Sequence, residues 1–89
     1  MGGARFRTKR LGEKLRQIRD ALGLSQSEML RRLGFDQELW YTQISAYEMG
    51  RREPPLIILL EYARAAGVST DVLIDDELDL PAKLPARRK

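Results

Sequence analysis

The sequence predicts a small all-α domain built from five short helices, and three observations lead to this prediction. The chain has 89 residues, 43% of them apolar, which is enough for one compact core and too few for two domains. Apolar residues recur at the three- and four-residue spacings of helices, and no segment shows the alternation of a half-buried strand. Glycines and prolines divide the chain into segments of helical length.

The first two helices are marked by their apolar faces and by their ends. A first helix is expected over residues 11–22, ending at Gly23, because glycine suits the left-handed position that follows a helix. Its apolar face consists of Leu11, Leu15, Ile18 and Leu22. Ser25 and Glu28 have the spacing of a capping box, in which each side chain binds the other residue's backbone N–H. A second helix therefore begins there and ends at Gly34.

The third helix is harder to delimit. Residues 35–41 are compatible with a loop or with an early helix start. Helical spacing joins Leu39 or Trp40 to Ile44, which places the helix at about residues 41–48. Trp40 either packs in the core or is an exposed contact, and we favour the core.

The last two helices follow a pair of prolines. Pro54-Pro55 suits the first turn of a fourth helix, which covers Leu56–Ala66 and ends at Gly67. Ser69 is expected to cap a short fifth helix over residues 70–74.

Charge is distributed unevenly along the chain, although the net charge is only +3. Residues 1–52 carry a net charge of +5, residues 53–81 a net charge of −6, and residues 82–89 a net charge of +4. A basic first half suits a polyanionic partner.

We therefore expect a flexible basic arm at residues 1–9, a helical domain at residues 10–75 and an extended tail at residues 76–89. The arm and the start of the domain carry side chains able to follow phosphates. These are Arg5, Arg7, Lys9 and Arg10.

The composition excludes several classes of function. The chain has no Cys and no His, so disulfides, thiolate metal sites, cysteine nucleophiles and histidine bases are excluded. The acidic residues 75–79 lack the glycine and terminal Glu of a calcium loop. We expect no enzyme activity, no metal and no cofactor. The longest apolar run, Leu56–Leu60, is far too short to cross a bilayer, so we expect a cytoplasmic protein.

Three stretches together resemble the Cro/repressor-type (XRE-like) helix-turn-helix family. They are Leu22–Met29 (LGLSQSEM) with Leu33-Gly34, Ile44–Pro54 (ISAYEMGRREP), and Leu59–Ser69 (LLEYARAAGVS). The resemblance covers roughly residues 10–75. It implies a five-helix fold whose third helix enters the major groove of double-stranded DNA. It therefore implies a sequence-specific DNA-binding transcriptional regulator, and we favour a repressor.

The resemblance also implies the residues that meet DNA. Gln26, at the start of the second helix, matches a phosphate-contacting position, where a helix N-terminus attracts anions. In the third helix, the positions that face base edges hold Tyr41, Thr42, Ser45 and Ala46, with Gln43 on the flank. Arg51 and Arg52 follow that helix where the family contacts the DNA backbone.

Arg19 and Glu48 also match family positions, and their side chains are expected to meet between the first and third helices. Such a pair fixes geometry more than it adds stability.

Two departures from the family pattern bear on these assignments. Gly34 and Ile44 are ten positions apart, which is farther than usual, so either the turn is longer or the third helix starts earlier. Either change moves the N-terminus of the third helix, so it bears most on the assignments of Tyr41 and Thr42. Leu30 stands where the family usually has alanine, at a close helix crossing.

The partners of the chain remain open at this point. A homodimer would read a palindromic site, and at least one of Ile57 and Ile58 is available for it unless the tail covers both. The alternative function is a protein-interaction module, such as an antitoxin-like protein that binds a partner through the acidic tail, Asp75–Leu80. Salt-sensitive DNA affinity distinguishes the two.

Overall fold

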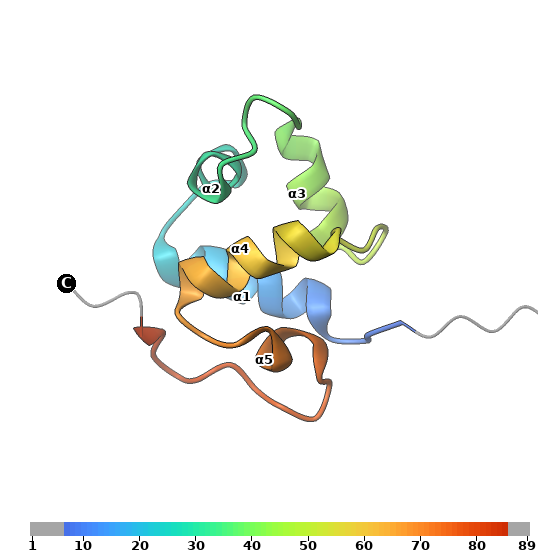
Figure 1. Ribbon diagram of the computed structural model, residues 1–89, viewed down its shortest axis with the longest axis vertical. Helices are drawn as coiled ribbons and strands as arrows, with labels where there is room; N and C mark the ends of the chain where they lie inside the picture. Colours follow the sequence, from blue (N-terminus) through green and yellow to red (C-terminus); the bar gives the residue numbers. More distant parts are fainter. Residues whose placement is uncertain (1–6, 86–89) are drawn as a thin grey trace, which may run out of the picture.

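The computed structural model describes residues 7–85 and consists of five helices, with no strand in that range. The helices are α1 (Leu11–Leu22), α2 (Gln26–Leu33), α3 (Tyr41–Glu48), α4 (Leu56–Ala66) and α5 (Thr70–Ile74) (Figure 1). The predicted all-α class and all five helices are thus confirmed. Within the same range, no helix is long and apolar enough to cross a membrane.

The ends of α2 show how local sequence sets the helix bounds. The Glu28 backbone N–H donates to Ser25 Oγ at 3.1 Å, and the Ser25 N–H donates to Glu28 Oε1 at 2.8 Å, which completes the predicted capping box. At the other end Gly34 adopts φ 88°, a left-handed conformation that costs other residues energy. Ser69 occupies the N-cap position of α5 as expected, but its side chain makes no capping hydrogen bond.

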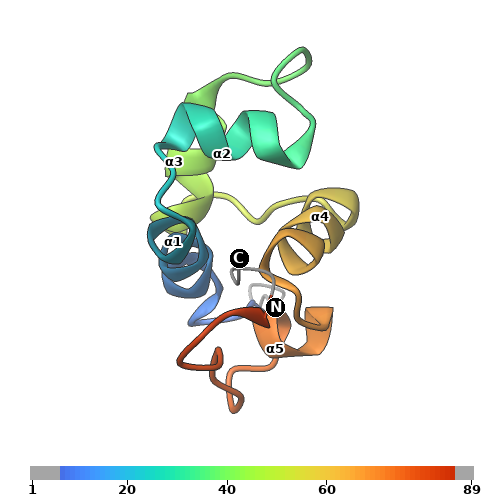
Figure 2. The same cartoon turned by 90° about the vertical axis from the view of Figure 1, so that its left-hand side faces the viewer.

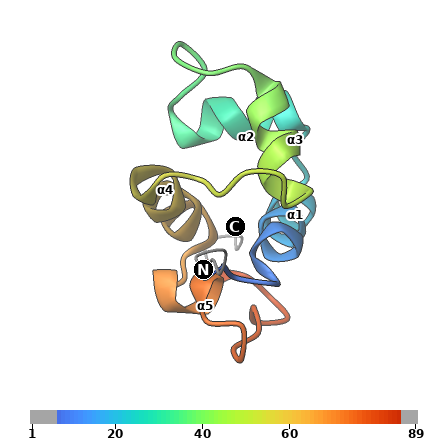
Figure 3. The ribbon, with the colours of Figure 1, turned by 90° about the vertical axis from the view of Figure 1, so that its right-hand side faces the viewer.

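The five helices form an elongated arrangement in which α1 and α4 occupy the middle. The helices α2 and α3 lie at one end, and α5 with the C-terminal segment lies at the other (Figures 2 and 3). Both α2 and α1 pack against α3. This places α3 at the edge of the molecule, with one side available to solvent.

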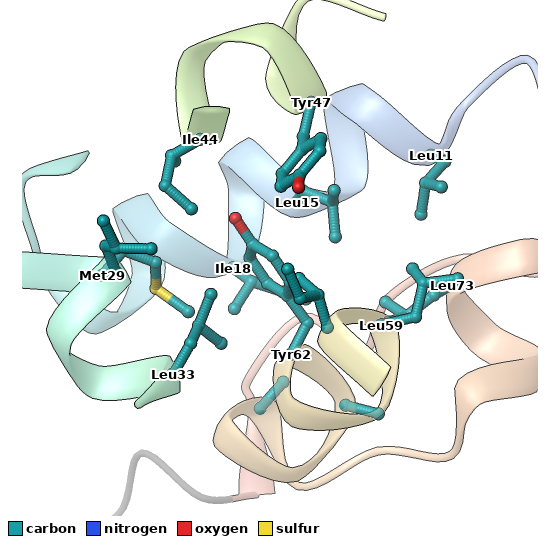
Figure 4. Close-up of a cluster of buried hydrophobic side chains, with 14 of the residues drawn as sticks. Leu11, Leu15, Ile18, Met29, Leu33, Ile44, Tyr47, Leu59, Tyr62 and Leu73 are labelled. Atoms are coloured by element: carbon teal, nitrogen blue, oxygen red, sulfur yellow. The ribbon is translucent and has the colours of Figure 1, made fainter. Parts of the chain in front are cut away.

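The core is one continuous apolar cluster contributed by all five helices. Figure 4 shows the Tyr62 ring of α4 in its middle, with side chains of α1, α2 and α3 around it. Burial raises the pKa of Tyr62 well above its usual range, and its hydroxyl has no hydrogen-bond partner among the described residues. The fully buried side chains include Leu15, Ile18, Met29, Ile44, Tyr62 and Leu73.

A polar network joins α1 to the chain that follows α5. The Lys14 side chain is only 1% exposed, and its Nζ donates to the carbonyl oxygens of Val72 at 2.8 Å and Asp75 at 2.9 Å. The Val72 carbonyl is one of those that the end of α5 leaves without a helical partner, so the lysine caps that helix, whereas the Asp75 carbonyl lies just past it and also accepts from the Leu78 N–H. The Asp76 carboxylate accepts from the backbone N–H groups of Lys9 and Arg10, which lowers the pKa of Asp76.

The segments on either side of the helices pack against them. Arg10 donates to the Asp76 carbonyl oxygen at 2.7 Å and pairs with the Asp79 carboxylate. Leu84 is buried in the core cluster. Of the other basic residues considered above, Arg5 and the tail residues 87–89 lie outside the described residues.

The expectation that Trp40 packs in the core was wrong. Its side chain is 79% exposed, whereas the neighbouring Leu39 packs against the core cluster. Both residues have helical spacing relative to Ile44, but Trp40 has extended backbone angles (φ −93°, ψ 154°) because it is the N-cap of α3. Both residues lie before α3, so helical spacing applies to neither, and the partly buried Leu39 is the one that packs against the core.

Candidate nucleic-acid interface

The connection between α2 and α3 is a longer turn, and α3 does not start early. Residues 36–38 form the turn, and α3 begins at Tyr41. Phe35 and Leu39, on either side of the turn, pack against the core. The extra residues therefore extend the turn while the start of α3 stays at the position that the sequence predicts.

The two sides of α3 differ in chemistry. One side is buried through Ile44 and Tyr47, and this burial raises the pKa of the Tyr47 hydroxyl. The other side has hydroxyl, amide and methyl groups and no charge. Of its residues Tyr41 and Thr42 are exposed, and Gln43, Ser45 and Ala46 are half-buried.

The structure brings together Arg19, Glu48 and Gln26 where α1, α2 and α3 meet. Arg19 Nε lies 2.6 Å from Glu48 Oε2, and Arg19 Nη2 donates to Glu48 Oε1 at 3.0 Å. This bidentate bond raises the pKa of Arg19. The same guanidinium donates to the Leu24 carbonyl oxygen at 3.0 Å, so one side chain links α1, α3 and the start of α2.

Gln26, at the first position of α2, donates from Nε2 to Glu48 Oε1 at 3.3 Å. A side-chain amide has two N–H donors. One of them therefore fixes Gln26 against α3, and the second makes no hydrogen bond within residues 7–85.

Gly12 of α1 brings that helix unusually close to the end of α3. A Cβ atom at this position would lie 2.6 Å from the Glu48 carbonyl oxygen and 2.8 Å from that of Tyr47. Sequence reasoning missed this residue, because a glycine in the first turn of an amphipathic helix has no pattern that distinguishes close packing from tolerance.

Basic side chains follow the end of α3, and Arg31 of α2 borders its start together with the acidic Asp36. Arg51 and Arg52 are exposed in the connection to α4, whose backbone is fixed by a 3.0 Å hydrogen bond from the Arg51 N–H to the Ala46 carbonyl oxygen. Arg31 and Arg32, which sequence reasoning did not assign, are exposed in the last turn of α2. Residues 7–85 contain no group of acidic side chains able to hold a metal ion.

Arg7 extends the basic region beyond Arg52. Its guanidinium donates to the Gly50 carbonyl oxygen at 3.2 Å and lies 3.4 Å from the Glu53 carboxylate. A surface depression of about 310 Å³ lies where the start of α1 meets the end of α3, and its lining includes three basic residues (Arg7, Lys9 and Arg52) and three acidic ones (Glu13, Glu48 and Glu53).

Comparison with known proteins agrees with this arrangement. A helix-turn-helix family model matches residues 15–73, more than half of the chain. An uncharacterized HTH-type transcriptional regulator, y4dJ of Sinorhizobium fredii, is 37% identical over 73 residues, which cover 82% of this chain and 90% of the relative. No solved structure is significantly similar to the chain. The matched residues include α2, the turn, α3 and the Arg19–Glu48 pair, and the chain belongs to the Cro/repressor-type (XRE-like) helix-turn-helix family of DNA-binding domains.

Proposed function

We propose that the protein is a sequence-specific regulator of transcription that inserts α3 into the major groove of double-stranded DNA and represses the genes it binds. One observation carries the proposal: the outward side of α3 is uncharged and accessible, Arg51 and Arg52 are exposed directly after it, and Arg31 borders its start. Base edges are read by neutral hydrogen-bonding and methyl groups, whereas phosphates attract cations. The name of the relative from Sinorhizobium fredii supports a role in transcription.

Each predicted residue has a role that fits its position. Tyr41 and Thr42 are at the N-terminal end of α3, which in helix-turn-helix proteins contacts base edges. Ser45 and Ala46 follow one turn later, where a hydroxyl meets base acceptors and a methyl packs on thymine. Gln43 flanks them.

The phosphate contacts are assigned to the ends of the helices. The free Gln26 amide donor and the N-terminus of α2 would hold one phosphate. Arg51 and Arg52 would hold phosphates on the far side of the groove, where they add affinity without sequence information.

We further propose that two copies bind DNA together through the start of α4. Leu56 is 84% exposed and Ile57 is 53% exposed, whereas Ile58 is buried, so the helix presents an apolar edge that the described part of the tail does not cover. A second copy is the occupant we assign, because a twofold dimer matches a palindromic site.

Selection from a randomised duplex pool, with the bound DNA sequenced, tests the function. We expect an enriched palindromic motif and an affinity that falls between about 50 mM and about 200 mM salt. Arg51→Ala should weaken binding to all sequences and make it less salt-dependent, because it removes a phosphate contact. Thr42→Ala should change the preferred base at one position. The absence of any binding at low salt would reject the proposal.

The interaction-module alternative receives less support from the acidic tail. The Asp76 carboxylate accepts two backbone N–H groups, and Asp79 pairs with Arg10, so both are already used within the chain. A partner that bound this segment would have to displace those contacts.

A further inference from the structure

The start of α3 carries a large aromatic side chain that the fold does not use. Trp40 is 79% exposed, whereas the tyrosines at 47 and 62 are buried in the core. Tryptophan is highly buried on average, and its exposed ring leaves a large apolar area in water. The fold alone gives no reason for tryptophan at this position.

Trp40 also leaves α3, the helix that follows it, without a side-chain cap. It is the N-cap residue of α3 and makes no capping hydrogen bond, whereas Ser25 forms a capping box at α2. Serine, threonine, aspartate and asparagine stabilise this position by accepting a backbone N–H, and tryptophan does not. A residue that favours neither the core nor the helix is expected at functional sites.

The surroundings of Trp40 suit duplex DNA. It directly precedes Tyr41 and Thr42, and it borders a depression of about 240 Å³ between α2 and the start of α3. Arg31 on one wall would attract a phosphate, whereas Asp36 on another, and Glu38 in a second depression that Trp40 also lines, would repel one. The ring is therefore better placed against the uncharged part of the groove than against the phosphates near the turn.

We infer that Trp40 is an additional DNA contact, in which the indole packs against deoxyribose carbons and thymine methyl groups beside the base pairs that face Tyr41 and Thr42. The indole N–H supplies one donor, and the ring supplies apolar area with little conformational freedom to lose. The longer turn before α3 places the indole there. This inference rests on the proposed function and adds an apolar anchor to its polar contacts.

Substitution at position 40 separates a DNA contact from a structural role. We expect Trp40→Ser to raise the melting temperature, because serine caps α3, and to weaken binding to the selected duplex about tenfold. Trp40→Ala should weaken binding similarly without that gain in stability. Ile74→Ala, which shortens another exposed apolar side chain on the distant α5, should leave the affinity unchanged.

The chain contains a single tryptophan, so its fluorescence reports on this contact directly. Quenching by acrylamide should be strong in the free protein and reduced when the selected duplex is added. If the duplex binds but the indole stays fully quenchable and Trp40→Ala binds as tightly as the native chain, the inference is overturned while the proposed function stands. A Trp40→Ala variant that loses self-association without DNA, at unchanged DNA affinity, would also overturn it. If no duplex is selected at all, the proposed function fails first.

Discussion

The helices α2 and α3 have eight residues each but are held in place by different means. Both ends of α2 are closed by its own sequence, and it buries Met29, Leu30 and Leu33. In contrast, α3 buries only Ile44 and Tyr47 and has no side-chain cap. A helix that presents one side to a ligand cannot bury that side, so its position must depend on neighbouring elements.

Those neighbours act on the C-terminal half of α3. Gly12 allows α1 to approach the carbonyl oxygens of Tyr47 and Glu48, and Arg19 binds the Glu48 carboxylate from the same helix. The first two residues of α3, Tyr41 and Thr42, and the preceding Trp40 are exposed, whereas Ile44 is buried in the core. Thus α3 is held from its middle to its C-terminal end, and its start is presented to solvent.

The largest effect on this comparison is expected from Gly12→Ala. The added methyl would overlap backbone atoms of α3 that cannot rotate away, so we expect a loss of about 3 kcal/mol of unfolding free energy and weaker DNA binding. Chemical denaturation and duplex titration measure the two. Gly23→Ala is the control, because a Cβ atom at Gly23 would meet no atom within 4 Å and would only strain the left-handed backbone (φ 72°). It should cost about 1 kcal/mol. Equal losses in the two variants would contradict the close-approach argument.

Breaking the Arg19–Glu48 pair should have the next largest effect. Glu48→Gln keeps the shape of the side chain but removes its charge from beside a guanidinium that is only 14% exposed. We expect a loss of about 2 kcal/mol and a reduced DNA affinity, because α3 loses its orientation. Melting temperature and duplex affinity give the measurement. A variant with the melting temperature and affinity of the native chain would show that the pair does not position α3.

Removing the cap of α2 should cost less and should leave α3 in place. Ser25→Ala abolishes the hydrogen bond from the Glu28 N–H, with an expected loss of about 1 kcal/mol. Amide hydrogen exchange should accelerate at the start of α2. The Gln43 N–H of α3 donates to the Trp40 carbonyl oxygen at 2.9 Å, and its exchange should change only as much as the loss of overall stability requires. Faster exchange in α3 alone would contradict the claim that Ser25 stabilises α2 locally.

The smallest effect is a difference in acid sensitivity between the two helices. The hydrogen bond from the Ser25 N–H lowers the pKa of Glu28 below its ordinary value of 4.5. A carboxylate whose folded pKa is depressed stabilises the fold fully above its unfolded pKa, and this contribution is lost as the pH falls through the folded value. Exchange at the start of α2 should therefore increase below about pH 4.5 relative to exchange in α3, which has no acidic residue in its first turn.

The control for this acid effect is Glu28→Gln, which keeps a side-chain acceptor for the Ser25 N–H and does not titrate. It is needed because the pKa values of Asp76 and Asp79 are also lowered, by backbone N–H groups and by Arg10 respectively, so overall stability falls in the same range. If the ratio of exchange rates in α2 and α3 changes with pH as much in this variant as in the native chain, the capping box is not the source of the acid sensitivity.

Local signals were enough to predict the helices. Ser25, Glu28 and Gly34 act on residues next to them, so the bounds of α2 could be predicted from the sequence. The meeting of Arg19 and Glu48 required the family resemblance, since nothing in the spacing of the two residues indicates it. The contacts of the predicted site residues with DNA remain predictions.

Trp40 and Lys14 show why the rest could not be predicted. Helical spacing suits Leu39 and Trp40 equally, and only the direction of the backbone at the N-cap decides which one enters the core. Lysine is almost always solvated, and Lys14 can be buried because two carbonyl oxygens far along the chain accept hydrogen bonds from its ammonium group. Long-range partners of this kind leave no trace in local pattern.

The cap that Lys14 places on α5 also determines where the domain can be cut. The family match ends at residue 73, but the Asp75 carbonyl oxygen, the Asp76 carboxylate and the buried Leu84 all come later. A fragment ended at the family boundary would deprive a buried ammonium group of one of its two acceptors and leave a gap in the core. A chimaera that transfers this domain to another protein should therefore be joined after residue 85.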